Sequence, residues 1–168
     1  MVPIEGGKLQ RMQMSIVLVC ALLLAVCGRT AAAELRRTVA AGDLVIVNAW
    51  MPQPVGGAKT GVIYLRIENK GTAADQLVGV ESPDAQQLML HESKDSGGVM
   101  KMIPLMAVEI PGNGEVDLKP MGIHLMATGL KTSPRQSDIF PMMLKFSKAG
   151  TVSVDVVVQA PNVLKPTK

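Results

Sequence analysis

The stretch 151-TVSVDVVVQ-159 places a valine at every even-numbered position from 152 to 158, with Ser153 and Asp155 among the residues between them. Successive side chains of a β-strand point to opposite faces, so this alternation predicts a strand with one buried face. From residue 44 onward the chain shows no stretch with the helical period of 3.6 residues. We therefore expect this part of the chain to be built from strands.

Short runs of similar character precede this stretch, separated by clusters of Gly, Pro and Asn such as 52–59 and 111–114. Such clusters are typical of turns. Many short strands joined by regular turns predict an all-β fold, either a sandwich or a Greek-key barrel. The other runs predicted as strands are 44–50, 61–68, 76–80, 88–92, 99–103, 108–110, 115–118, 123–127 and 142–146.

The composition fits one domain and argues against nucleic acid as a partner. The chain has 168 residues, of which 48 % are hydrophobic and only 2 % aromatic, so it has little to stack on bases. Without Lys8, Arg11, Arg29 and Glu5 near the N-terminus, 14 basic and 13 acidic residues remain, a net charge of +1. A nearly neutral domain lacks the basic patch that binds phosphate backbones or anionic membranes.

The N-terminus has the order of a secretory signal peptide, with Lys8 and Arg11, then an apolar run at 16–26, then small residues ending at Ala33. The run has 11 residues, whereas a helix needs about 20 to span a bilayer, so no membrane span is expected in the mature chain. We expect residues 1–33 to be cleaved and the protein to be periplasmic.

Two features of this segment allow alternatives. Translation can begin at Met12 or Met14, which changes the basic region. Cys27 resembles a lipid-attachment site, but such sites usually have a small residue before the cysteine, and Val26 is not small. Lipid anchoring at Cys27 is therefore not favoured.

The cysteine count becomes informative once this segment is removed, because Cys20 and Cys27 both lie in it. The mature chain has no thiol and can be neither a disulfide scaffold nor a thiol enzyme. Nine of the twelve methionines remain in the mature chain. We expect a β domain at 34–160 and a flexible tail at 161–168.

The mature chain has two histidines, His91 and His124. In a strand at 123–127, residues i and i+2 point to the same face, so His124 and Met126 are expected to lie side by side. An imidazole nitrogen and a thioether sulfur would then be available to one ligand.

A hairpin is expected to pair the other histidine with a methionine. If a two-residue loop lies at 96–97, His91 is directly opposite Met102, and Glu92 is opposite Lys101 on the other face. Cross-strand partners have Cβ atoms about 4.5–5.5 Å apart, close enough to share one ion. A four-residue loop with a bulge is also compatible with the sequence.

Two imidazoles and two thioethers are the donor set for a soft monovalent ion. Thioether sulfur selects copper(I), whereas zinc prefers thiolate, imidazole and carboxylate, and calcium or magnesium prefers oxygen. The sequence therefore predicts one copper(I) ion bound by His91, Met102, His124 and Met126.

The spacing of these four residues resembles the metal motif of the periplasmic copper chaperones of the PCuAC family. Segments around the motif are similar as well: LHES at 90–93, EIPGNGEVDLKP at 109–120, HLMATGLK at 124–131 and FSKAGTVSVDV at 146–156. The resemblance covers nearly all of the mature chain. It implies a cupredoxin-like fold, copper(I) bound at these four positions, and delivery of copper to a cytochrome oxidase subunit or an assembly factor.

The chain departs from the family pattern at two places. Met121 stands where the family usually has Gly, so either the turn before His124 differs or an extra sulfur approaches the ion. The C-terminal tail has no His or Met, which argues against a second copper site there.

Other functions and other roles for the methionines are also compatible with the residues. A periplasmic copper scavenger or resistance protein without a dedicated recipient would have the same site. An enzyme or electron carrier is not expected, because a blue-copper site needs a cysteine and copper oxidases need more histidines. Packing is the simplest role for Trp50 and for five methionines, namely Met89, Met100, Met106, Met142 and Met143.

Overall fold

The computed structural model describes residues 38–162, so the predicted signal peptide at 1–33, Cys27 and most of the predicted tail lie outside the described residues. Within residues 38–162 the protein is all-β, with a short 3-10 turn at Val55–Gly57 and no α-helix. The strands are β1 (Thr38–Ala41), β2 (Leu44–Pro52), β3 (Thr60–Asn69), β4 (Asp75–Glu81), β5 (Gln87–Asp95), β6 (Met100–Leu105), β7 (Val108–Ile110), β8 (Gly114–Leu118), β9 (Ile123–Thr128), β10 (Ile139–Phe146) and β11 (Gly150–Gln159). Every predicted strand is confirmed, and only β1 was not predicted.

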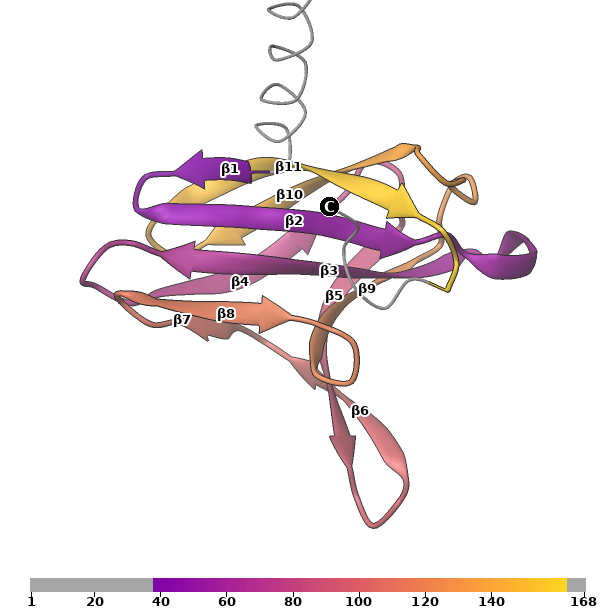
Figure 1. Cartoon of the computed structure of the whole chain (residues 1–168), viewed down its shortest axis with the longest axis horizontal. Coiled ribbons are helices and arrows are strands. Elements are labelled where there is room, and N and C mark those ends of the chain that lie inside the picture. The colour runs from indigo at the N-terminus through magenta and orange to yellow at the C-terminus, as the bar shows by residue number, and fades with distance from the viewer. Residues whose placement is uncertain (1–37, 163–168) are drawn as a thin grey trace, which may run out of the picture. The chain divides into compact units, whose positions relative to one another are not determined.

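The strands surround one interior as a nearly closed barrel (Figure 1). Hydrogen-bonded neighbours follow the order β6-β5-β9-β3-β2-β11-β10-β4-β7, with β1 on β2 and β8 on β3. β3 changes partner along its length, since its first half pairs with β9 and its second half with β8. β11 is antiparallel to β10 but parallel to β2, and it thereby ties the end of the domain to its beginning.

The alternation in β11 is realised as predicted, because its even-numbered valines are at most 8 % exposed while Ser153 and Asp155 face solvent. Each fully buried valine side chain contributes about 1.5–3 kcal/mol. Trp50 and Met142 are buried as expected, at 3 % and 1 % exposure, and Met143 is half-buried. The largest fully buried side chains are Ile46, Met51, Ile63, Ile67, Leu77, Ile110, Leu125, Met142, Leu144, Val156 and Val158.

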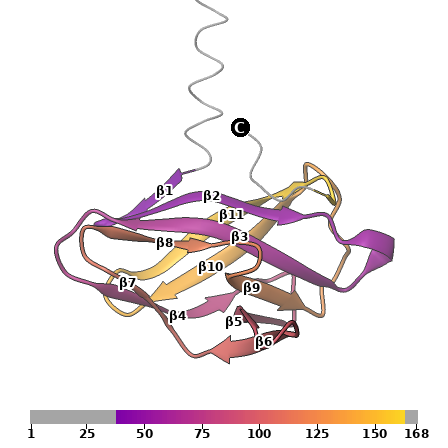
Figure 2. The same cartoon turned by 60° about the horizontal axis from the view of Figure 1, so that its bottom comes forward.

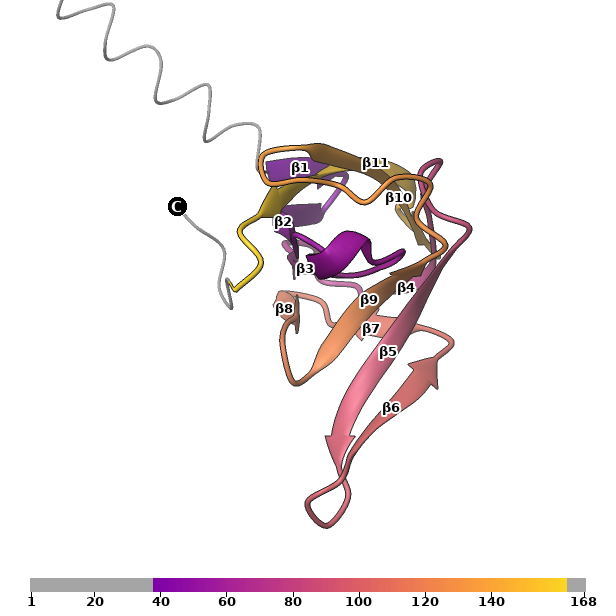
Figure 3. The same cartoon turned by 90° about the vertical axis from the view of Figure 1, so that its right-hand side faces the viewer.

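One hairpin extends out of the barrel. β5 lies beside β9 in the barrel wall (Figure 2), and its far end continues with β6 as an arm that projects away from the other strands (Figure 3). β6 is an edge strand, and Met100, Met102 and Ile103 on it are 46 %, 61 % and 39 % exposed. The histidine-bearing part of β5 therefore lies where the arm leaves the barrel wall.

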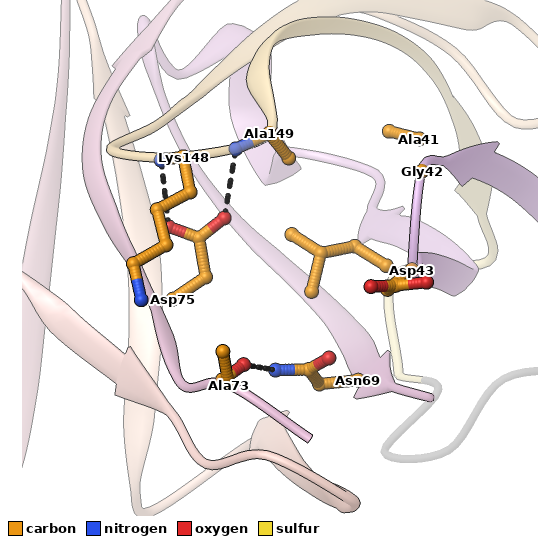
Figure 4. A pocket seen from close by; sticks show the side chains of 9 residues that line it. Ala41, Gly42, Asp43, Asn69, Ala73, Asp75, Lys148 and Ala149 are labelled. Atoms are coloured by element: carbon orange, nitrogen blue, oxygen red, sulfur yellow. Dashed lines mark hydrogen bonds between the residues drawn. The ribbon is translucent and has the colours of Figure 1, made fainter. Parts of the chain in front are cut away.

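A buried carboxylate fixes the turn between β10 and β11. Asp75 is 5 % exposed, and its Oδ1 accepts hydrogen bonds from the Gln76 N–H (2.7 Å), the Ser147 hydroxyl (2.8 Å) and the Lys148 N–H (2.9 Å). Its Oδ2 accepts one from the Ala149 N–H at 2.9 Å. Figure 4 shows this carboxylate pointing at the backbone of the turn, on one wall of a small pocket. Three of the four donors are backbone and hydroxyl groups of the turn and the fourth is the neighbouring Gln76 N–H, so Asp75 is a structural residue.

Candidate metal centre

The two histidines face each other across two neighbouring strands. β5 and β9 are antiparallel, and their register pairs His91 directly with His124. The ring centroids are 6.0 Å apart, and the ring planes differ by 30°. Both side chains are buried, with 9 % and 4 % exposure. The paired histidines form the centre of the candidate site, although the sequence analysis placed each histidine beside a methionine instead.

Each ring holds a buried nitrogen without a hydrogen-bond partner. These atoms are Nδ1 of His91 and Nε2 of His124. The other nitrogen of His124, Nδ1, lies 3.1 Å from the carbonyl oxygen of Gly122. A carbonyl only accepts, so Nδ1 carries the proton and Nε2 has a free lone pair. Buried polar atoms are rarely left unpaired, and a metal-binding imidazole commonly donates its other N–H to a backbone carbonyl, which orients the ring.

The separation of the rings fits one ion between them. A nitrogen–metal bond of about 2.0 Å and roughly 1.2 Å from nitrogen to ring centre allow two centroids on one ion to be up to about 6.4 Å apart. The observed 6.0 Å is within this limit. The ring separation therefore allows one metal ion to be bound by both histidines.

Met126 is placed as predicted. It follows His124 by two positions on β9, so its side chain leaves the same face of the sheet. It is half-buried, and its cross-strand neighbours are Val62 on β3 and Met89 on β5. The side chains of His124 and Met126 therefore leave β9 on the same face.

The predicted register of the β5–β6 hairpin is wrong by two residues. Met102 is opposite Ser93, and His91 is opposite Pro104. The loop is the four-residue alternative at 96–99, closed by a Ser96 N–H to Val99 C=O bond of 2.9 Å. The shift is even, so Met102 keeps the face of His91 but lies farther along the arm, with 61 % of its surface exposed.

The physical reason for the shift lies in the loop sequence. Gly97 and Gly98 both take positive φ, at 69° and 85°, a region that glycine enters without strain. The Gly98 N–H also donates to Oδ1 of Asp95 at 2.7 Å, which fixes the longer loop. A two-residue loop at 96–97 would lose this side-chain bond.

The same shift overturns the predicted cross-strand ion pair. Glu92 is opposite Ile103, and Lys101 is opposite Lys94. Glu92 instead pairs with Lys94 on its own strand, with 3.0 Å between Oε2 and Nζ. Both side chains are partly exposed, so this pair contributes little to stability.

Two methionines of the arm are more exposed than the core or rim packing expected of them. Met100 and Met106 are 46 % and 92 % exposed, because the arm projects beyond the barrel. Met89 is half-buried and opposite Met126, one cross-strand pair away from the histidines. The sequence signal for Met89 was its spacing of two from His91, the same spacing that singled out Met126.

The turn before His124 accommodates Met121 in place of the glycine that is usual in the family. Its φ is +64°, in the left-handed region where glycine is favoured, and its side chain is 72 % exposed. The turn is closed on both sides of it, by Lys119 N–H to Ile123 C=O at 2.7 Å and Gly122 N–H to Lys119 C=O at 3.2 Å. The turn therefore keeps the glycine conformation at the cost of strain.

Replacing Met121 by Gly should stabilise the protein by up to about 1 kcal/mol, because the left-handed strain is relieved. Urea unfolding of the two proteins measures the difference. Met106→Gly is the matched control, since Met106 is also exposed but has no positive φ, and the change there should give no gain. Equal stability of wild type and Met121→Gly would contradict the strain.

The metal-free protein should lose stability as the pH falls below the ordinary histidine pKa. Burial, and then the charge of His124, lower the pKa of His91 below its ordinary value of 6.5. The unfolded chain therefore binds more protons than the folded chain as the pH falls below 6.5, and the free energy of unfolding decreases through that window. Urea unfolding between about pH 7 and about pH 5 measures this slope. The slope should be smaller in His91→Gln, and equal slopes would contradict the shift.

Two further features of residues 38–162 concern metal ligands and membrane spans. No three side chains among His, Cys, Asp and Glu come together there in a way that could hold a metal ion. The same residues include no helix that is long and apolar enough to cross a membrane.

The chain is similar to a known family of proteins over most of the described residues. The LpqE-like family, described as lipoproteins, matches residues 44–158. The protein Lxx21020 of Leifsonia xyli subsp. xyli, which carries the same description, is 28 % identical over 120 residues, covering 71 % of each chain.

Similar solved structures confirm the expected family resemblance and the cupredoxin-like all-β fold. The copper-bound PCuAC domain from PmoF2 is 26 % identical, with a TM-score of 0.64, over 74 % of this chain and 98 % of that domain. Apo-DR1885 from Deinococcus radiodurans is 25 % identical, with a TM-score of 0.56, over 73 % of this chain and 83 % of that one.

Proposed function

The chain belongs to the LpqE-like family, and from this membership and the paired histidines we propose that it is an exported copper(I) metallochaperone. It binds and transfers the ion without catalysing a reaction. The ligands are His91, His124, Met126 and Met102. The observation that carries the proposal is the pair of buried, unpartnered nitrogens on facing histidines.

The chemistry of the donors favours copper(I) as the cargo. Imidazole and thioether are neutral and soft, and thioether ligands select copper(I) over zinc. Both cysteines of the chain precede residue 38, so the domain offers no thiolate. Thioether and imidazole ligands keep working in an oxidising compartment, where thiols form disulfides. The copper-bound state of the similar PmoF2 domain supports copper as the cargo.

The position of Met102 suits transfer. The two histidines and Met126 lie on β5 and β9 in the barrel wall, whereas Met102 is on the exposed edge strand of the arm. An exposed ligand on an edge strand can be released first, which opens a coordination position for a donor from the recipient. The exchange then proceeds one ligand at a time.

The recipient is a cytochrome oxidase subunit or an assembly factor for that enzyme, and a deletion strain tests this. Delivery by a chaperone matters most when copper is scarce. The oxidase activity of the deletion strain should therefore fall in copper-poor medium and recover with added copper. A gene encoding His91→Ala and His124→Ala together should fail to restore it. Normal oxidase activity at every copper level in a strain without a homologous protein would end the delivery role, and a growth defect only at high copper would favour scavenging.

Export leaves a mature chain that mass spectrometry can identify. Cleavage after Ala33 predicts a periplasmic chain that begins at Glu34 and carries no lipid. The family's description as lipoproteins supports export and raises the alternative of an acylated Cys27. An intact mass that corresponds to a chain beginning at Cys27 with acyl groups attached would show that the protein is lipid-anchored and not soluble.

A further inference from the structure

The two segments that carry the histidines have the same three residue types in reverse order. β5 contains Met89-Leu90-His91, and β9 contains His124-Leu125-Met126. Because the strands are antiparallel, this order places His opposite His, Leu opposite Leu, and Met opposite Met. The two leucines are 4 % and 0 % exposed and belong to the core. The two histidines and the two methionines therefore share the opposite face of the sheet.

This local two-fold arrangement makes Met89 equivalent to Met126. Each methionine is two positions from a histidine on its own strand and directly opposite the other methionine. Both are half-buried. Directly opposed residues have Cβ atoms about 4.5–5.5 Å apart, and the unbranched methionine side chain is long and flexible. By register, Met89 therefore lies at the same offset from the histidine pair as Met126.

Met102 does not have this equivalence. It is opposite Ser93, one cross-strand position farther out than the histidine pair, and it is 61 % exposed. Four donors, two nitrogens and two sulfurs, are already present on β5 and β9 without it. A soft ion is satisfied by about four such donors.

We propose that Met89 is a copper(I) ligand, so that two imidazoles and the facing thioethers of Met89 and Met126 hold the ion, and that Met102 exchanges with Met89. This rests on the proposed copper(I) site at His91 and His124. When the copper–Met102 bond breaks, the ion stays bound to the residues of β5 and β9. When the copper–Met89 bond breaks instead, the ion is bound by Met102 on the exposed arm.

Three variants of the mature domain test the proposal, namely Met89→Leu, Met102→Leu and the two combined. Leucine keeps the apolar volume and removes the sulfur. X-ray absorption of the copper(I)-loaded Met102→Leu protein should count two nitrogens and two sulfurs, and the combined variant should keep one sulfur. Competition with a chromophoric copper(I) chelator should show about a tenfold weaker affinity for the combined variant than for Met102→Leu. Met142→Leu, in the core, is the control and should match wild type.

A single sulfur in Met102→Leu would overturn the role of Met89, as would equal affinities of Met102→Leu and the combined variant. Failure of the copper(I) site itself has a different signature. In that case wild type binds no copper(I), or a variant lacking both histidines binds it as wild type does.

Discussion

The variant with both His91→Ala and His124→Ala is expected to bind copper(I) at least about a thousandfold more weakly than wild type. Two of the nitrogens that face the ion are removed, and a loss of about 2 kcal/mol for each corresponds to that factor. The remaining thioethers of Met126 and its neighbours bind only weakly without them. Competition against a chromophoric chelator at pH 7 measures the change.

Both histidines are buried, so the alanine variant also leaves space in the barrel wall. His91→Leu with His124→Leu fills this space with apolar side chains and removes the same nitrogens. It should lose copper(I) to the same extent while it unfolds at a urea concentration no lower than that of wild type, because two unpaired polar atoms have left the interior. Wild-type affinity in either double variant would contradict the histidine ligands.

Replacing Asp75 by Asn should lower the free energy of unfolding by about 3 kcal/mol. The carboxylate accepts four hydrogen bonds, from Gln76, Ser147, Lys148 and Ala149. In asparagine one of the two oxygens becomes an NH2 group, which would face donors instead of accepting from them. Burial by itself raises the pKa of Asp75, but the hydrogen bonds from Ala149, Gln76, Ser147 and Lys148 outweigh it and hold the pKa below its ordinary value of 3.8. This stabilisation is complete above pH 3.8 and is lost as the pH falls through the folded-state pKa.

Asp155→Asn is the matched control, because Asp155 lies on β11 with its side chain exposed. Urea unfolding at pH 7 should show a large loss for Asp75→Asn and almost none for the control. Between about pH 5 and about pH 2 the Asp75 variant should lose less stability than wild type. Equal unfolding midpoints for wild type and Asp75→Asn would show that the carboxylate does not hold the turn.

Strand positions could be predicted because each strand carries its own signal. In β11 the valine alternation alone determines which face is buried, and Ile123–Thr128 orients His124 and Met126 by the same rule. β1 was missed because Thr38–Ala41 is short and has no fully buried residue. The parallel pairing of β11 with β2 joins strands far apart in the chain, and no local pattern encodes such a partner.

The sequence named candidate ligands but could not predict how they are arranged. The sequence pointed to both histidines, yet their direct pairing depends on β5 and β9 being neighbours, which is a property of the whole barrel. The register error at Met102 came from the loop, where Asp95 and two glycines favour four residues over two. Met89 was expected to pack because its partner Met126 lies on a strand that local reasoning does not bring beside it.

Copper(I) titration of the mature domain, with X-ray absorption of the loaded protein, is the most direct measurement. It should give one ion per chain, with two nitrogen neighbours and at least two sulfur neighbours. A stoichiometry of zero, or a first shell of nitrogen and oxygen without sulfur, would contradict a copper(I) site built from the paired histidines and their methionines.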